Sequence, residues 1–129
     1  MAARRTRRTR FALEGDLHRA VAQFLDLMAK RYGFVWTTVP GGDGRMTRAP
    51  GYRAGWPDVL LIWPRAIASM IELKREKGGV VSEAQSEVGA ALRTVSCLVT
   101  VARSIEDVAA HLKAAAALIE RDDDLGVAA

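Results

Sequence analysis

Cysteine is almost absent from this sequence: Cys97 is the only one among 129 residues. A single cysteine excludes an internal disulfide framework and a zinc site built from clustered cysteines. Long apolar runs are absent too. None approaches the roughly 18 residues needed to span a bilayer, and no apolar stretch follows the N-terminal arginines to complete a secretory signal. We therefore expect a cytoplasmic protein with no membrane partner, in which Cys97 packs in the core and is not a nucleophile.

Acidic residues are missing from the first 13 positions, which hold five arginines: Arg4, Arg5, Arg7, Arg8 and Arg10. The net charge of the chain is +4, and removing these five charges leaves −1. The basicity is therefore concentrated in a flexible tail over residues 1–12. This pattern is typical of an arm that binds DNA or another polyanion. The alternative is an N-terminal segment that has no partner.

The length of 129 residues, half of them hydrophobic, predicts one domain with enough apolar material for a core. Apolar periodicity, β-branched runs and capping residues predict seven elements. They are a helix over 13–32, strands over 34–39, 58–63 and 69–74, a helix over 82–95, a strand over 97–101 and a helix over 104–120. The domain then covers 13–120, and a disordered acidic tail follows over 121–129.

This order of elements predicts an α/β fold with a mixed sheet. Strands two and three are adjacent in sequence and fit a hairpin. The strand–helix–strand unit that follows predicts a right-handed parallel crossover. Helices are expected on both faces of the sheet.

Charged residues interrupt the third predicted strand at Glu72 and Lys74. Because they are two apart in a strand, their side chains leave the same face. Asp58 begins the neighbouring strand of the hairpin, so its carboxylate can lie beside Glu72. Two adjacent carboxylates repel each other unless a cation lies between them, and Mg²⁺ or Mn²⁺ takes oxygen ligands of this kind. The alternative is a salt-bridge cluster at an exposed edge.

A divalent ion at this place would polarise a phosphodiester oxygen and lower the pKa of its bound water. Lys74, beside the ion, could orient the attacking water or help to deprotonate it. The three residues therefore predict phosphodiester hydrolysis.

The pattern Pro57-Asp58 followed by Glu72-Leu73-Lys74 resembles the signature of the PD-(D/E)XK nuclease superfamily. The predicted order of elements is similar to its restriction-endonuclease-like core. Over about residues 13–112 the chain resembles, more narrowly, a VRR-NUC (virus-type replication-repair nuclease) domain. The matching segments are Glu14 with His18, Gly55-Trp-Pro-Asp58, Ile71-Glu-Leu-Lys74, Gly78-Gly79, Ser82-Glu-Ala-Gln85 and Val101-Ala-Arg-Ser104. His18 departs from the family pattern, in which a glutamine is common at this place.

The resemblance implies a role for each matched position. It implies metal ligation by Asp58, Glu72 and the backbone carbonyl of Leu73, assistance to the nucleophile by Lys74, a contribution from Glu14 through water or a second metal, and a place facing the site for Gln85. It further implies Mg²⁺ as cofactor with Mn²⁺ as a substitute, branched or four-way junction DNA as substrate, a homodimer, and an origin in a bacterial host, a phage or a prophage.

Two classes of function fit these residues. The first is a metal-dependent DNA endonuclease, and the second is a non-catalytic nucleic-acid-binding module of the same fold. The first is favoured because Asp58, Glu72 and Lys74 are all present, whereas a degenerate relative tends to lose at least one. A helical partner-binding protein that uses the Ala-rich C-terminal stretch would explain none of the three.

A long glycine-rich loop over residues 40–55 carries three further arginines. We expect Arg45, Arg48 and Arg53 to face phosphates, the alternative being an ordinary solvated loop. Trp56 either stacks on a base or packs beneath the turn that precedes Asp58. The two histidines, His18 and His111, fall on predicted helices, where a structural role is the more common one.

Overall fold

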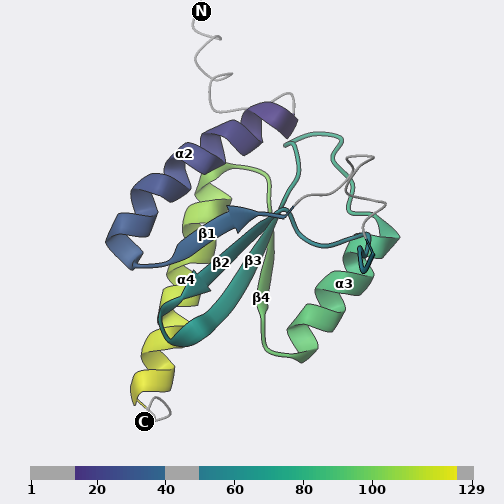
Figure 1. The fold of residues 1–129 in the computed structure, drawn as a ribbon. Helices are drawn as coiled ribbons and strands as arrows, with labels where there is room; N and C mark the ends of the chain where they lie inside the picture. The colour runs from purple at the N-terminus through teal and green to yellow at the C-terminus, as the bar shows by residue number, and fades with distance from the viewer. Residues whose placement is uncertain (1–13, 40–49, 125–129) are drawn as a thin grey trace, which may run out of the picture.

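The computed structural model describes residues 14–39 and 50–124 (Figure 1). Its elements follow the predicted order. They are α2 (Glu14–Tyr32), β1 (Val35–Thr38), β2 (Val59–Trp63), the 3₁₀ turn η2 (Pro64–Ala66), β3 (Ile67–Leu73), α3 (Glu83–Thr94), β4 (Leu98–Ala102) and α4 (Ile105–Asp124). None of the described helices is long and apolar enough to cross a membrane.

The four described strands form one mixed sheet in the order β1-β2-β3-β4. Strands β1 and β2 pair antiparallel, as do β2 and β3, whose hairpin places Val59 opposite Ile71. Strands β3 and β4 pair in parallel, with Glu72 opposite Val101, and α3 forms the crossover between them. The predicted α/β class, hairpin and parallel crossover are therefore confirmed.

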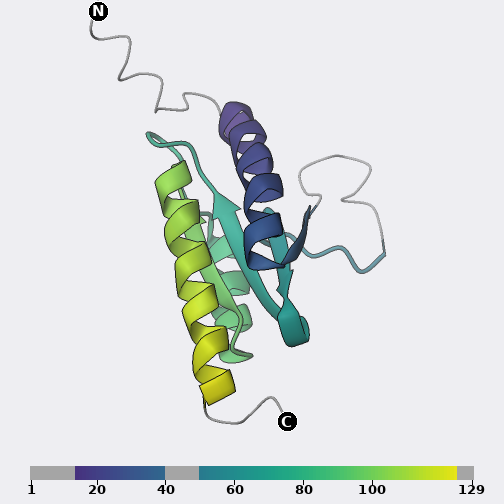
Figure 2. The same ribbon diagram turned by 90° about the vertical axis from the view of Figure 1, so that its left-hand side faces the viewer.

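Helices cover both faces of the sheet, as predicted. Helices α2 and α4 lie side by side on one face, and α3 lies on the other (Figures 1 and 2). The main core fills the space between α2, α4 and the sheet. Its members include Leu17, Leu25, Leu61, Ile71, Leu73, Val108 and Leu112, all at most 1% exposed. This core requires alternate residues of β3 to face α2 and α4, which leaves Met70 and Glu72 facing α3.

A buried polar cluster fastens α4 to the sheet. Nε2 of His111 lies 2.8 Å from Oγ of Ser69, and Nδ1 lies 2.7 Å from Oγ1 of Thr100. Trp63 donates to the same Ser69 hydroxyl over 2.9 Å. Burial lowers the pKa of His111 to about 4, because the interior disfavours the imidazolium form. The histidine is therefore neutral near pH 7 and holds two strands to α4.

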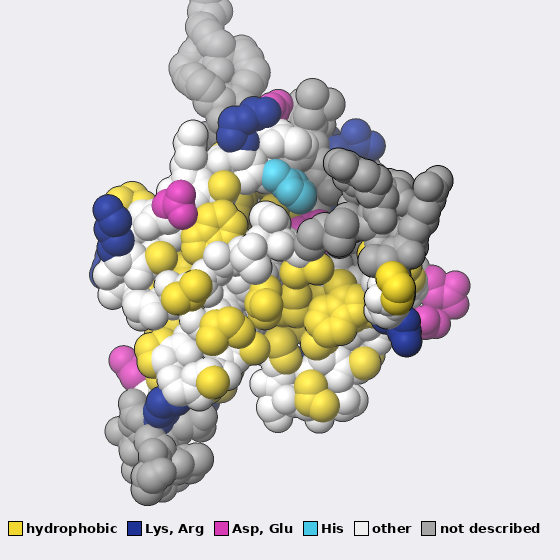
Figure 3. Space-filling model, viewed as in Figure 1, with side chains coloured by type: hydrophobic (Ala, Val, Ile, Leu, Met, Phe, Trp, Pro, Cys, Tyr) yellow, Lys and Arg dark blue, Asp and Glu magenta, His cyan; other side chains and the backbone are white. Residues whose placement is uncertain are grey.

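Helix α3 covers only part of its face of the sheet. Hydrophobic side chains remain exposed beside it, over β1 and β2 (Figure 3). They include Val35, Trp56, Ile62 and Val95, and a hollow of about 470 Å³ lies among Trp56, Leu60, Met70 and neighbouring side chains. Cys97 lines this hollow and is half-buried, and burial raises the pKa of its thiol.

Two element boundaries differ from the prediction by two residues or more, and the others agree to within one residue. The last helix extends from the predicted end at residue 120 to Asp124, so part of the predicted acidic tail is helical. No glycine or proline occurs before Gly126 to stop it, and charge alone does not end a helix. Strand β3 begins at Ile67, two residues early, because the hairpin turn needs only Pro64–Ala66.

Candidate active site

Glu72 lies near the end of strand β3, and Lys74 follows directly after the strand at the same end of the sheet. Glu72 is 4% exposed and faces α3, whereas its neighbour Leu73 packs in the main core. The backbone N–H of Lys74 donates to the carbonyl of Ala102 over 3.0 Å, which continues the pairing with β4. Nζ of Lys74 lies 3.4 Å from Oε2 of Glu72. The two charged groups are therefore adjacent on one face, as their spacing predicts.

Asp58 is fixed just before β2 by two backbone hydrogen bonds. Its carbonyl accepts from the N–H of Val39 over 2.7 Å. Its side-chain Oδ2 accepts from the N–H of Leu73 over 2.7 Å, which ties the carboxylate to the end of β3. The structure thus brings Asp58 beside Glu72, close enough for its charge to act on the Glu72 carboxyl.

The Glu72 carboxyl has a pKa close to neutral pH. Burial raises its pKa most, and the negative charge of Asp58 raises it further, while Lys74 acts in the opposite direction. The resulting pKa is about 7, compared with an ordinary value of 4.5. Within the described part of the chain, Oε1 of this carboxyl has no hydrogen-bond partner although it is buried. A buried carboxylate oxygen without a donor calls for a proton or a cation.

Gln85 holds the other oxygen of Glu72 from α3. Its Nε2 donates to Oε2 of Glu72 over 2.7 Å. Its Oε1 accepts from the N–H of Ser82 over 2.8 Å, and the Ser82 hydroxyl accepts from the Gln85 N–H over 3.1 Å. The predicted capping box is therefore present, and the same glutamine also faces the site.

A close backbone contact sets α3 against the segment that leads to Asp58. Gly55 has a φ of +97°, and a Cβ at this position would overlap the carbonyl group of Ala84 in the first turn of α3. Only glycine permits both the conformation and this approach. The Gly55-Trp-Pro-Asp58 motif gives no local sign of this contact, because Ala84 lies 29 residues further along the chain.

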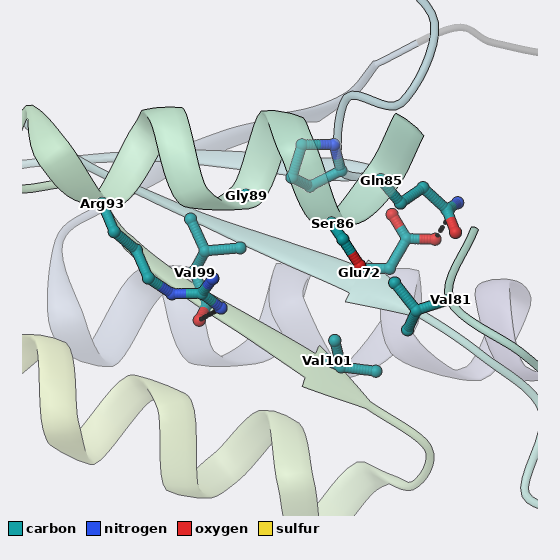
Figure 4. A pocket seen from close by; sticks show the side chains of 9 residues that line it. Glu72, Val81, Gln85, Ser86, Gly89, Arg93, Val99 and Val101 are labelled. Carbon is teal, nitrogen blue, oxygen red and sulfur yellow. Dashed lines mark hydrogen bonds between the residues drawn. The ribbon is translucent and has the colours of Figure 1, made fainter. Parts of the chain in front are cut away.

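A pocket of about 280 Å³ opens between α3 and the sheet at this site (Figure 4). Glu72, Gln85 and Ser86 lie at one end of it, and Arg93 lies at the other. Val99 and Val101 of β4 form its apolar wall. The Glu72 carboxyl is thus buried but borders open space.

Other predicted site residues fall in different places. Glu14 is the first residue of α2, and its side chain lies outside the described part. Arg53 is exposed and donates to the carbonyl of Tyr52 over 3.1 Å, next to Trp56, which is 43% exposed and lines a hollow beside α3. His18 is half-buried on α2. Outside the described residues lie Arg4, Arg5, Arg7, Arg8, Arg10, Arg45 and Arg48.

The donor set suits a hard cation. Asp58 and Glu72 supply carboxylate oxygens, the ligand type that Mg²⁺ and Mn²⁺ prefer. No group of three or more His, Cys, Asp or Glu side chains with metal-binding geometry occurs within residues 15–39 and 50–121, whose side chains are described. Two carboxylates therefore converge here, and the unpartnered Oε1 of Glu72 is the observation that fits a bound cation.

No family model matches the sequence, and no curated protein matches it. A solved structure described as a VRR_NUC domain is similar in fold, with a TM-score of 0.56. The match covers 73% of this chain and 91% of that one, at 19% sequence identity. The chain has the fold of a VRR_NUC domain. In this fold the residues that carry the sequence resemblance, Asp58, Glu72 and Lys74, lie together at one end of the sheet.

Proposed function

We propose that this chain is a metal-dependent nuclease that hydrolyses phosphodiester bonds in DNA. The observation that carries the proposal is the convergence of Asp58, Glu72 and Lys74, with Gln85 bonded to Glu72, at one end of a VRR_NUC fold. A salt-bridge cluster on a surface would be solvated, whereas Glu72 is buried and has a pKa of about 7. Perturbed carboxyls that border a pocket are typical of functional sites.

Asp58 and Glu72 would hold the cation, joined by the backbone carbonyl of Leu73, and Glu14 would contribute from the start of α2. When bound, a divalent ion supplies positive charge that polarises the phosphodiester and lowers the pKa of bound water. Oε2 of Glu72 is taken by Gln85 and Lys74, which leaves Oε1 for the ion. Oδ2 of Asp58 likewise receives the Leu73 N–H, and this bond orients the carboxylate.

Lys74 and Gln85 would position the reacting groups at this site. Lys74, whose side chain is 12% exposed, places a positive charge where negative charge develops on the phosphate. Its ammonium can orient the attacking water while its own position is held by Glu72. Gln85 keeps the Glu72 carboxylate from rotating, because its amide is fixed at the other end by the Ser82 N–H.

We further propose branched or four-way junction DNA as the substrate, and a homodimer as the active form. What supports a second copy is the exposed apolar surface over β1 and β2 that α3 leaves open. A C₂ dimer would supply two symmetric sites for a junction. Sedimentation at micromolar concentration tests this claim, since a monomeric chain that still cleaves junctions would contradict it.

One cleavage assay tests the main proposal. Linear, flap, nicked and four-way DNA are incubated with the protein and Mg²⁺ or Mn²⁺, with EDTA as the metal-free arm. Glu72→Gln is the inactive comparison, and Glu120→Gln, an exposed carboxylate near the far end of α4, is the control with the same charge change. We expect metal-dependent cleavage by wild type and Glu120→Gln only. Binding of DNA without cleavage by wild type would instead make the chain a non-catalytic nucleic-acid-binding module.

A further inference from the structure

The segment that joins β3 to α3 begins at the site and folds back on itself. Gly78 has a φ of +81° and lies against the Arg75 guanidinium. A Cβ added at Gly78 would lie 3.0 Å from Nη2 of Arg75. A Cβ at Gly79 would lie 3.0 Å from the Arg75 carbonyl oxygen and 3.1 Å from Cβ of Lys74. The returning end of the loop therefore packs directly on Lys74.

The Arg103 side chain bridges the two ends of this loop. Its Nη1 donates to the carbonyl of Arg75 over 3.1 Å and to the carbonyl of Gly79 over 2.8 Å. One nitrogen thus holds both ends of the loop, 75 and 79. Hydrogen bonds from a charged donor are stronger than neutral ones, so this contact resists opening.

Arg103 is itself anchored where β4 joins α4. Its backbone N–H donates to Oδ2 of Asp107 over 2.8 Å, and the Asp107 N–H donates to the Ser104 hydroxyl over 3.1 Å. The preceding residue, Ala102, accepts from the Lys74 N–H. The guanidinium therefore projects from a rigid junction that is paired with the strand carrying Lys74.

We propose that Arg103 is a positioning residue, which fixes the β3–α3 loop and through Gly79 holds the Lys74 side chain against Glu72. The inference rests on the proposed function. It assigns a role to a residue outside the group formed by Asp58, Glu72, Lys74 and Gln85. Loss of the guanidinium frees residues 75–79, so Lys74 loses the backbone that packs on its Cβ. Replacing a residue that orients the ligands of a metal site without touching the metal typically lowers metal affinity or activity by about 10–100-fold.

A double-mutant cycle on turnover tests the path through Lys74. Arg103→Ala is expected to lower kcat by about 10–100-fold and to leave KM within about twofold. Arg103→Lys should recover part of kcat, because an ammonium can donate to the same carbonyls. In the Lys74→Ala background, Arg103→Ala should change kcat by less than about twofold, since residues that act as one unit are not additive.

The matched control is Arg65→Gln. Arg65 also donates to a backbone carbonyl, that of Ile119 over 3.2 Å, but it follows β2 at the opposite end of the sheet. Its substitution should leave kcat unchanged. Equal losses from Arg103→Ala with and without Lys74 would overturn the proposal. A raised KM at constant kcat would overturn it too, and would make Arg103 a phosphate contact.

Amide hydrogen exchange tests the loop without any activity. Arg103→Ala should accelerate exchange over residues 75–81, with Arg65→Gln showing the wild-type pattern there. If Arg103→Ala does not fold, Arg103→Lys and Arg103→Gln provide the same comparison. Unchanged exchange in a folded variant would overturn the clamp. If wild type cleaves no DNA, the proposed function fails, while exchange still decides whether Arg103 holds the loop.

Discussion

Gln85 donates a 2.7 Å hydrogen bond to Oε2 of Glu72, although it is the third residue of α3 and completes that helix's capping box. Its amide oxygen accepts from Ser82, which determines that the amide nitrogen faces the carboxylate. The start of α3 and the orientation of a buried carboxyl are therefore one arrangement.

Loss of either carboxylate should abolish metal-dependent cleavage. The two substitutions should change the stability of the metal-free protein in opposite directions. Because the pKa of Glu72 is raised to about 7, its stabilising contribution is complete below pH 4.5 and is lost as the pH rises through 7. Glu72→Gln should thus stabilise the metal-free protein at pH 8 by roughly 1–3 kcal/mol. Asp58→Ala orphans the Leu73 N–H and should destabilise it by about 1–3 kcal/mol. Thermal unfolding measures both, and Asp58→Asn, which keeps an acceptor, is the control. Destabilisation by Glu72→Gln at pH 8 would contradict the unfavourable effect that burial and the Asp58 charge have on the ionised Glu72 carboxyl.

Lys74→Ala should separate metal binding from turnover. The lysine provides no ligand oxygen, so Mn²⁺ should still raise the melting temperature, because a cation that binds only the native state stabilises it. Turnover should fall by about 10²–10⁴-fold, the usual range for electrostatic and proton-transfer assistance. Wild type and Lys74→Ala should be compared at pH 8. Lys74 lowers the pKa of Glu72, so without the lysine Glu72 ionises only at a higher pH. Lys77→Ala, an exposed lysine of the same loop, should keep kcat. Loss of the Mn²⁺ shift in Lys74→Ala would mean that the lysine only supports the carboxylates.

Gly55→Ala should be more damaging than Gly51→Ala. Both glycines have positive φ, +97° and +85°, but a Cβ at Gly51 meets nothing within 4 Å. Gly51→Ala should therefore cost only the backbone strain, about 1–2 kcal/mol. Gly55→Ala also forces the segment before Asp58 away from Ala84 in α3. We expect a larger drop in melting temperature and a loss of cleavage, measured on both variants. Similar melting temperatures would show that the contact can relax.

Acid should weaken the fold through His111. Its folded pKa of about 4 lies below the ordinary 6.5, so the neutral form is favoured in the fold and stability is lost as the pH falls from 6.5 to 4. Protonation of Glu72 opposes this trend over part of the same range. The measurement is therefore made in Glu72→Gln, which should lose about 2–3 kcal/mol between pH 7 and 4.5. Adding His111→Gln should flatten that slope. A slope that persists would place the acid-sensitive group elsewhere.

Deletion of residues 1–10 should alter affinity and spare the chemistry. The deletion removes five arginines, and each contact with a duplex phosphate contributes about 0.9 to the slope of log K against log salt. We expect the slope to flatten by about 2 units, with about 4.5 as the upper limit. Single-turnover cleavage at saturating protein should barely change. An unaltered slope would show that the tail does not bind DNA, and loss of single-turnover cleavage would show that it does more than hold the substrate.

Local sequence patterns predicted the parts of the site that are close in sequence. The two-residue spacing of Glu72 and Lys74 determined their shared face, and the spacing of Ser82 and Gln85 predicted the capping box; the structure has both. The order of elements also followed from periodicity, because helix and strand patterns repeat within each segment.

Contacts between distant segments were not predictable in this way. Nothing near Asp58 indicates that its carboxylate binds the Leu73 N–H 15 residues later, nor that Arg103 reaches back to the carbonyl of Arg75. Gly55 shows the same limit, because its close partner belongs to another element. Such contacts depend on how the layers pack, and composition and spacing along the chain do not specify that.

Strand β3 serves two layers at once, and this has a consequence for folding fidelity. Ile71 and Leu73 face the main core, while Glu72 between them faces α3. If β3 paired with β2 one residue out of register, every side chain would change face. Glu72 would then enter the apolar layer occupied by Leu61, away from Gln85 and together with Lys74, and burial of charged side chains in that layer is expensive. The residue proposed to bind the metal therefore also penalises misaligned hairpins, so its replacement by an apolar side chain should broaden the set of registers that the refolding chain explores.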